Sequence, residues 1–227
     1  MKDIGAGESF LSAGTAEPRA GSSLYESLGK RTVDLVLGLA LLPIVGPLVG
    51  LLALLVWMKD GGAPFFGHWR AGRDGCAFRC WKIRTMVPDA ETRLRIHLAD
   101  DPSAAAEWRE FRKLADDPRI TPIGDFLRRT SLDELPQLWN VMRGEMSFVG
   151  PRPVTEEELQ QYYGSTRAAY NAMRPGITGL WQVSGRNALS YDQRVALDLS
   201  YLRRLSFVLD LWIMLRTAGV VMRPTGR

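Results

Sequence analysis

Two adjacent carboxylates, Asp133 and Glu134, begin the largely apolar segment DELPQLWNVM. Arginines flank this segment on both sides, at Arg128, Arg129, Arg143 and Arg152. An ionised carboxylate beside a bound diphosphate can hold a divalent cation, or it can attack phosphorus and form an acyl phosphate. Arginine supplies bidentate contacts to phosphate oxygens. The region therefore contains a nucleophile, a second carboxylate and cations, which are the groups that phosphoryl transfer requires.

The same carboxylates also have a purely structural interpretation. Ser131 and Glu134 have the spacing of a capping box, and Asp133 could itself cap a helix. Pro136 is compatible with a first helical turn, where its missing N–H costs little. Both interpretations place the pair at a helix N-terminus, whose free N–H groups favour an anion. We therefore expect the carboxylates to have low pKa values and to stay ionised.

A second group of cations lies on a predicted β-hairpin. The Asp-Gly pair at 74–75 is a strong two-residue turn signal, and its flanks, 65–70 and 76–84, have the character of strands. Side chains alternate between the two faces of a strand, so Lys82 and Arg84 should share a face. This arrangement would suit a clamp for phosphate oxygens. A solvated, charged strand edge is the equally weighted alternative.

Segment 35–58 contains no charged residue and is long enough as a helix to cross a bilayer. Its length makes the core helix of a soluble protein the weaker interpretation. Pro43 and Pro47 lie near the middle, with Gly46 between them. Each proline removes a backbone donor and clashes with the preceding turn, so we expect a bend there.

The charges that flank this segment bear on its topology. Lys30 and Arg31 precede it, and Lys59, Arg70 and Arg73 follow it. Basic residues beside membrane segments prefer the cytoplasmic side. A straight span would place one basic flank outside, whereas a bent helix that enters and leaves by the same face satisfies both flanks. We therefore favour a re-entrant helix–bend–helix over a span.

Composition sets broader limits. A chain of 227 residues is sufficient for one sizeable domain, or one domain with an appendage. A net charge of +4 suits an anionic partner, but the absence of long basic blocks argues against a nucleic-acid-binding arm. Cys76 and Cys80 are expected to be reduced thiols. His68 and His97 are too few and too far apart in the chain to indicate a metal cluster.

The pattern predicts an α+β fold that is mostly helical. We expect a flexible polar tail at 1–27, a re-entrant membrane helix at 28–59 and a cytosolic catalytic domain at 60–227. Within the last part, 88–116 and 157–172 should be helical and 174–187 should form a loop. Segment 205–222 is apolar but interrupted by charges, which predicts an interfacial amphipathic helix or one packed against the membrane segment.

Several segments together resemble the bacterial sugar transferase family, the monotopic phosphoglycosyl transferases. The resemblance covers 30–223 and rests on the order of six motifs: KRTVD, KIRTM, DPRIT, LRRTSLDELPQLWNVMRGEMSFVGPRP, RPGITGLWQVSGR and DLWIMLRT. Leu42 stands before Pro43 where relatives commonly have serine. Many relatives also have further membrane helices upstream, so we expect this chain to be a minimal form.

The resemblance implies a specific reaction. Family members transfer a sugar 1-phosphate from a nucleotide diphosphate sugar to polyprenyl phosphate and release a nucleoside monophosphate. They require Mg²⁺ and act at the cytoplasmic face of the bacterial inner membrane. The region around the hairpin is most similar to the exopolysaccharide-initiating, undecaprenyl-phosphate galactose phosphotransferase type. UDP-galactose or UDP-glucose is therefore the expected donor.

The resemblance also implies roles for individual residues. The nucleophile would be Asp133, which would form a covalent phosphosugar intermediate. Glu134 would either hold Mg²⁺ together with Asp133 or handle the proton of the lipid phosphate. The phosphate-binding cations would be Lys82, Arg128 and Arg152, with Arg84 as a neighbour.

The expected partners are the inner leaflet of the membrane, polyprenyl phosphate and a nucleotide sugar. Nucleic acid is not expected, since the chain has no clustered basic helix or aromatic platform. A homodimer is an open alternative. The rival function is a membrane-anchored scaffold in which the acidic pair only caps a helix and the arginines contact lipid head groups.

Overall fold

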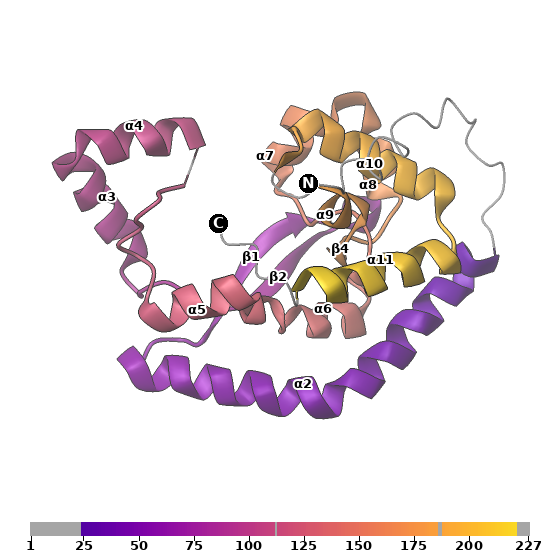
Figure 1. Ribbon diagram of the computed structural model, residues 1–227, viewed down its shortest axis with the longest axis horizontal. Helices are drawn as coiled ribbons and strands as arrows, with labels where there is room; N and C mark the ends of the chain where they lie inside the picture. Colours follow the sequence, from indigo (N-terminus) through magenta and orange to yellow (C-terminus); the bar gives the residue numbers. More distant parts are fainter. Residues whose placement is uncertain (1–23, 112, 186–187, 222–227) are drawn as a thin grey trace.

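The computed structural model describes residues 24–111, 113–185 and 188–221. The protein is a mostly helical α+β structure, as predicted, and it contains two small sheets (Figure 1). Its α-helices are α2 Lys30–Asp60, α3 Ala90–Asp100, α4 Pro102–Phe111, α5 Pro122–Thr130, α6 Gln137–Arg143, α7 Glu156–Glu158, α8 Arg167–Asn171, α9 Leu180–Ser184, α10 Tyr191–Arg204 and α11 Phe207–Val221. Its strands are β1 Phe65–Ala71, β2 Ala77–Ile83, β3 Ser147–Val149 and β4 Gly176–Thr178. Short π or 3₁₀ turns are η1 Tyr25–Gly29, η2 Arg73–Gly75, η3 Leu132–Glu134, η4 Leu159–Tyr163 and η5 Gly164–Thr166.

The predicted hairpin is present. β1 and β2 pair antiparallel, with His68 opposite Cys80. The turn between them uses positive φ angles at Asp74 (58°) and Gly75 (75°), which is the conformation that an Asp-Gly pair favours. Both cysteines are free thiols.

The second sheet was not predicted, because segment 174–187 was expected to be a loop. The structure forms β4 and α9 there, and β4 pairs in parallel with β3. The two backbones approach so closely that a Cβ on Gly176 would lie 2.1 Å from the amide nitrogen of Gly150. The glycines that suggest a loop in the sequence therefore permit a close crossing of two backbones.

Helix α2 is continuous through both prolines and bends part-way along its length (Figure 1). Including η1, the helical segment Tyr25–Asp60 is long and apolar enough to cross a membrane, judged by length and composition. This helical segment begins within 1–27, the range that was predicted to be a flexible tail. Residues 1–23 of that range lie outside the described residues. Gly61 ends the helix with a φ of 68°.

The N-terminal half of α2 is attached to the rest of the protein by polar contacts. Asp34 is buried and accepts hydrogen bonds from the Ser147 hydroxyl and the Phe148 amide, both at 2.9 Å. The Lys30 ammonium lies 2.7 Å from Asp210 Oδ2 on α11. A charge placed this close to a buried carboxylate offsets much of its desolvation cost.

The C-terminal half of α2 is attached by apolar contacts instead. Leu52 and Val56 form a buried cluster with Ile83 of β2 and Leu127 of α5. The remaining apolar side chains of the helix are largely exposed, including Leu39, Ile44, Leu51 and Met58. Both ends of α2 therefore contact the same folded unit, while much of its length presents apolar surface.

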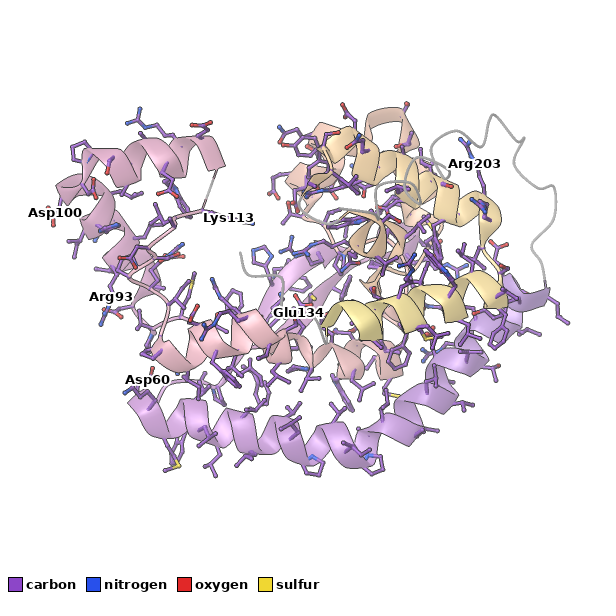
Figure 2. The ribbon with its side chains drawn as sticks, in the orientation of Figure 1. Asp60, Arg93, Asp100, Lys113, Glu134 and Arg203 are labelled. Atoms are coloured by element: carbon purple, nitrogen blue, oxygen red, sulfur yellow. The ribbon has the colours of Figure 1, made fainter. Side chains whose placement is uncertain are left out.

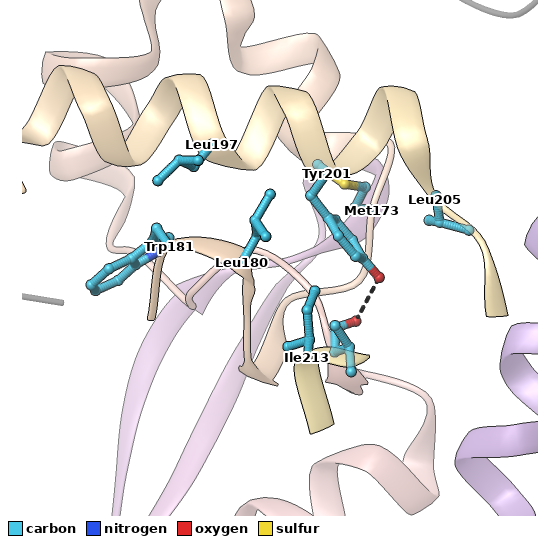
Figure 3. Packing of buried hydrophobic residues seen from close by; sticks show 8 residues of the cluster. Met173, Leu180, Trp181, Leu197, Tyr201, Leu205 and Ile213 are labelled. Carbon is cyan, nitrogen blue, oxygen red and sulfur yellow. Dashed lines mark hydrogen bonds between the residues drawn. The ribbon is translucent and has the colours of Figure 1, made fainter. Parts of the chain in front are cut away.

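The largest core cluster lies between α9, α10 and α11 (Figure 3). Leu180, Leu197 and Ile213 are each at most 1% exposed and fill its centre. Tyr201 extends its hydroxyl to the Val149 carbonyl at 3.3 Å and to Asp210 Oδ1 at 2.7 Å. The cluster thereby connects α10 and α11 to β3. Helix α11 packs against α9, β3 and β4 and, through Asp210, also contacts the start of α2.

A second, smaller core contains a buried acid. Asp198 of α10 is 2% exposed and accepts a hydrogen bond from the Tyr163 hydroxyl at 2.7 Å. Burial raises the pKa of Asp198 to about 7, and the tyrosine hydrogen bond opposes that rise only partly. An acid whose pKa is raised by folding stabilises the folded state at low pH, and this contribution is lost as pH rises through the folded pKa.

We therefore expect Asp198→Asn to reduce the pH dependence of stability. Between about pH 4 and pH 7 the wild type should lose the stability contributed by this group, whereas asparagine does not titrate. The melting temperature of the variant relative to the wild type should rise by on the order of 5 °C over this interval. Thermal unfolding in detergent at several pH values measures this difference. A constant difference would show that Asp198 titrates normally.

Candidate active site

The acidic pair does not cap a helix, so the capping-box prediction is wrong. Ser131 has a positive φ of 58° and closes α5, with its N–H directed to the carbonyls of Leu127 and Arg128. Its side chain makes no capping hydrogen bond. Asp133 and Glu134 lie in the short turn η3 before α6, where Asp133 is buried and the Glu134 side chain is 29% exposed.

Lys82 of β2 connects to both carboxylates. Its ammonium donates a hydrogen bond to Glu134 Oε1 at 2.6 Å and lies 3.8 Å from Asp133 Oδ2. Figure 2 shows Glu134 near the centre of the molecule, where η3 meets the hairpin. The sequence predicted a functional Lys82 and a functional acidic pair separately, and the structure brings the three residues together.

Asn140 holds this arrangement in place. It is fully buried in α6, and its side chain pairs with the free backbone edge of β2. Its Oδ1 accepts from the Trp81 amide at 3.0 Å, and its Nδ2 donates to the Arg79 carbonyl at 2.7 Å. The amide therefore makes the hydrogen bonds that a third strand would make to β2, next to Lys82. Sequence reasoning missed Asn140, although a lone amide within the apolar stretch LWNVM was the available signal.

The two carboxylates differ in their protonation behaviour. Burial raises the pKa of Asp133, and the nearby Lys82 charge offsets this only in part. Burial would also raise the pKa of Glu134, but the charge and hydrogen bond of Lys82 hold that pKa below its ordinary value. The expectation of a low pKa was therefore met by Glu134 and not by Asp133. A poorly solvated carboxylate such as Asp133 is a stronger nucleophile than one in water.

A partly open cavity lies beside Glu134 and Lys82. Its polar lining includes three cations and two amides in addition to Glu134: Arg70, Lys82, Arg152, Gln137 and Gln182. Sequence reasoning identified Lys82 and Arg152 but not Arg70 or the two glutamines. Arg70 is partly engaged by Glu158, at 3.1 Å.

Hydrogen bonds to Tyr170 and to β1 hold the main chain around Arg152 in place. The Tyr170 hydroxyl lies 3.2 Å from the Arg152 carbonyl and accepts from the Val154 amide at 3.3 Å. The Val154 carbonyl in turn accepts from the Ala71 amide at 2.9 Å, which attaches this loop to β1. A buried tyrosine thus fixes the main chain that carries an exposed arginine towards the cavity.

The other two predicted cations do not line this cavity, although the charge of Arg128 acts to lower the pKa of Asp133. Arg128 is exposed, and its Nε donates to Thr85 Oγ1 at 2.8 Å. Arg84 directly follows β2, and its guanidinium donates to Asp60 at 2.8 Å. The structure therefore does not bring Arg84 beside Lys82 as a clamp.

The donor groups present suit a magnesium ion shared with substrate. In the part of the chain that the structure describes, no group of three or more metal-ligating side chains comes together. Mg²⁺ is commonly held by one or two carboxylates and completed by water and substrate phosphates. Asp133 and Glu134 are the neighbouring carboxylates that would supply such ligands here.

Comparison with known proteins identifies the fold family. Residues 25–224 match the family model described as bacterial sugar transferase. The chain belongs to this family.

Named relatives share about half of the residues of this chain over the region in which they match it. It is 52% identical over 197 residues to the UDP-galactose-lipid carrier transferase of Erwinia amylovora, covering 87% of this chain and 41% of that protein. It is 47% identical over 199 residues to the exopolysaccharide production protein ExoY of Sinorhizobium fredii, covering 88% of each chain. It is 47% identical over 200 residues to the undecaprenyl-phosphate galactose phosphotransferase of Salmonella typhimurium, covering 87% of this chain and 41% of that protein. The chain therefore spans about two fifths of two of these relatives.

We expect Asn140→Ala to weaken both the fold and the site. Removing the amide leaves the Trp81 N–H and the Arg79 carbonyl without their partner, which should cost about 2–4 kcal/mol of unfolding free energy. The melting temperature should fall by roughly 5–10 °C. The exposed Gln161→Ala serves as control and should be neutral. An unchanged melting temperature for Asn140→Ala would show that other contacts hold α6 against β2.

Proposed function

We propose that this sugar transferase moves a sugar 1-phosphate from a UDP-sugar to undecaprenyl phosphate and releases UMP. The sugar is galactose or glucose, and the reaction is the first membrane step of exopolysaccharide synthesis. The names of the Erwinia, Sinorhizobium and Salmonella relatives support the substrate class. The observation that carries the proposal is the buried Asp133 carboxylate beside Lys82 and Glu134, next to a cation-lined cavity.

The reaction proceeds in two displacements at one phosphorus. Asp133 attacks the β-phosphorus of the UDP-sugar, and the bond from that phosphorus to the bridging oxygen breaks. UMP leaves with the bond electrons, and the sugar phosphate remains as an acyl phosphate on Asp133. An oxygen of undecaprenyl phosphate then attacks the same phosphorus. This step frees Asp133 and yields undecaprenyl-diphosphate-sugar.

The cations make the first attack feasible. An anionic carboxylate approaching an anionic phosphate is opposed by charge repulsion, which positive groups fixed near the phosphate offset. Lys82 and Arg152 occupy such positions around the cavity, with Arg70 as a third cation. Arg128 and Arg84 act from further away, Arg84 by fixing the end of the hairpin to Asp60.

Magnesium is proposed as the cofactor, held by Asp133 and Glu134 together with the donor diphosphate. When bound, it would neutralise phosphate charge and polarise the reacting phosphorus. Glu134 keeps its charge at neutral pH because Lys82 holds its pKa low, so it is available either as a ligand or as an acceptor for the proton of the lipid phosphate.

The location proposed is the cytoplasmic face of the bacterial inner membrane, with α2 as a re-entrant helix. Asp34 near one end of α2 bonds to β3, and Val56 near the other end packs on β2 and α5. Both ends therefore contact one folded unit, which is difficult to reconcile with ends on opposite sides of a bilayer. The exposed apolar side chains between them provide the surface that lipid would cover.

Replacing the nucleophile gives the decisive test. Asp133→Asn should lower UMP release from UDP-galactose by at least about 10³-fold, because the amide cannot form the acyl phosphate. Rapid quench of the wild type with donor labelled on the sugar should trap a protein-bound adduct that the variant lacks. Asp125→Asn, which alters an exposed ion pair with Arg129, serves as control and should keep its activity.

The variant should also remain folded. Asp133 carries a buried charge, so its neutralisation should not lower the melting temperature. Normal turnover by Asp133→Asn would contradict the assignment of the nucleophile and would favour a scaffold.

Topology can be tested with single cysteines on either side of α2. In a Cys76→Ser background, Glu26→Cys and Asp100→Cys should both react with a membrane-impermeant maleimide only when the probe is added from the cytoplasmic side. Cys80 is buried and should stay silent. Labelling of Glu26→Cys from the opposite side, with Asp100→Cys still cytoplasmic, would establish a full span.

A further inference from the structure

A carboxylate outside the cavity holds one of the cations that line it. Arg70, near the end of β1, lines the cavity together with Lys82 and Arg152. Its Nη1 donates a hydrogen bond to Glu158 Oε2 at 3.1 Å. Glu158 belongs to α7 and lies outside the lining of the cavity. The carboxylate therefore contacts Arg70 without occupying the space that a ligand would fill.

This contact uses only part of the Arg70 guanidinium. The hydrogen bond comes from Nη1, whereas a guanidinium carries five N–H groups in one plane. The bond therefore leaves donors in the same plane for a phosphate oxygen. Because the group is planar and rigid, holding one nitrogen restricts the directions of the others. An arginine held in this way presents a defined edge to an anionic ligand.

Glu158 is itself held in place. Its Oε2 also accepts the Thr155 N–H at 2.8 Å, and the Thr155 hydroxyl accepts the Glu158 N–H at 3.2 Å. This capping box fixes the carboxylate in the first turn of α7. Tyr191 of α10 faces the same carboxylate, because burial and then the charge of Glu158 raise the pKa of the tyrosine hydroxyl. The group that contacts Arg70 is therefore fixed from two elements, although 39% of its side chain is exposed.

Main-chain contacts bring Arg70 and Glu158 together. The Ala71 N–H donates to the Val154 carbonyl at 2.9 Å, which joins the end of β1 to the segment that precedes α7. The same segment carries Arg152. One junction thus places two of the three cations of the cavity, and the ion pair with Glu158 then sets the direction of the Arg70 side chain.

Such an arrangement has a consequence for binding. A long side chain that is not held must be ordered when its ligand binds, and ordering it weakens binding by roughly 3- to 10-fold. A carboxylate that has already ordered Arg70 removes this loss. Residues held by contacts behind the site are also the ones that keep a productive geometry.

We propose that Glu158 is a positioning residue that orients Arg70 towards the diphosphate of the donor. This inference rests on the proposed function, in which the cations around the cavity offset the charge of the UDP-sugar. Glu158 contacts neither the substrate nor the reacting atoms, and its effect passes through Arg70. Removal of Glu158 should therefore matter only while Arg70 is present.

A double-mutant cycle tests this dependence. UMP release from UDP-galactose and UDP-glucose is measured for the wild type, Glu158→Ala, Arg70→Ala and the double variant. Glu158→Ala should lower kcat/KM for the UDP-sugar by roughly 3- to 10-fold. Arg70→Ala should lower it by roughly 10- to 100-fold, because a charge-assisted contact is lost. In the Arg70→Ala background, removal of Glu158 should have no further effect.

Inhibition by UDP gives a second measurement that does not depend on the chemical step. UDP carries the diphosphate but no sugar. Its inhibition constant should rise in Glu158→Ala by the same factor by which kcat/KM falls. The Arg70→Ala background should abolish this difference, because the carboxylate then has no guanidinium to orient.

Two further variants separate positioning from stability. Glu156→Ala removes a carboxylate from the same helical turn, where it pairs with Arg167 at 2.6 Å, and it should keep the wild-type kcat/KM. Glu158→Gln removes the charge but can keep the capping box. It should lie between the wild type and Glu158→Ala in kcat/KM and retain the wild-type melting temperature. If Glu158→Ala does not fold, the same cycle with Glu158→Gln decides.

Three results would overturn the proposal. Equal losses on removal of Glu158 with and without Arg70 would show that Glu158 acts on the fold in general. A kcat/KM that stays at the wild-type value in Glu158→Ala would show that Arg70 needs no orienting partner. A kcat/KM that rises in this variant would show that the carboxylate keeps Arg70 away from the donor.

Failure of the underlying function is distinguishable from failure of this inference. Absence of UMP release by the wild type with every UDP-sugar would overturn the phosphoglycosyl transferase assignment itself. Normal wild-type turnover combined with any of the three results above would overturn only the role of Glu158.

Discussion

The geometry of the site depends on the side-chain amide of Asn140, which makes the two hydrogen bonds to β2 that a neighbouring strand would make. Asn140 pairs with the free edge of β2 beside Lys82, and this contact fixes the distance between the hairpin and the turn that carries Asp133 and Glu134. Lys82 and the two carboxylates, which are far apart in the sequence, can then offset each other's charge in a partly buried position. That neutralisation lets one carboxylate stay charged while burial raises the pKa of the other.

Helix α2 supports the same region from below in the view of Figure 1. Its first half bonds through Asp34 to β3, and its second half packs through Val56 onto β2. The apolar helix is thus an integral part of the folded unit that contains the candidate site and more than an attached anchor. The combination suits a reaction between a water-soluble donor and a lipid acceptor, because the element that would meet lipid also braces the strand that carries Lys82.

Local signals in the sequence predicted local structure well. The Asp-Gly turn fixed the hairpin, because its backbone preference needs no distant partner. Features that depend on remote contacts were missed: β4 forms only because β3 lies beside it, and Ser131 closes α5 instead of starting the next helix. The raised pKa of Asp133 likewise comes from burial, which no spacing of residues reveals. Residue types and spacing singled out the acidic pair, and the motif resemblance added their roles, but the contacts of Asn140 required the fold.

The crossing of Gly150 and Gly176 has a consequence for the cavity. No β-carbon fits at that point, so any replacement must push apart the two backbones that meet there. One of these backbones leads directly into the loop that carries Arg152, and the other begins β4. A substitution at either glycine would therefore displace the main chain that leads to the Arg152 side of the cavity, although neither residue has a side chain of its own.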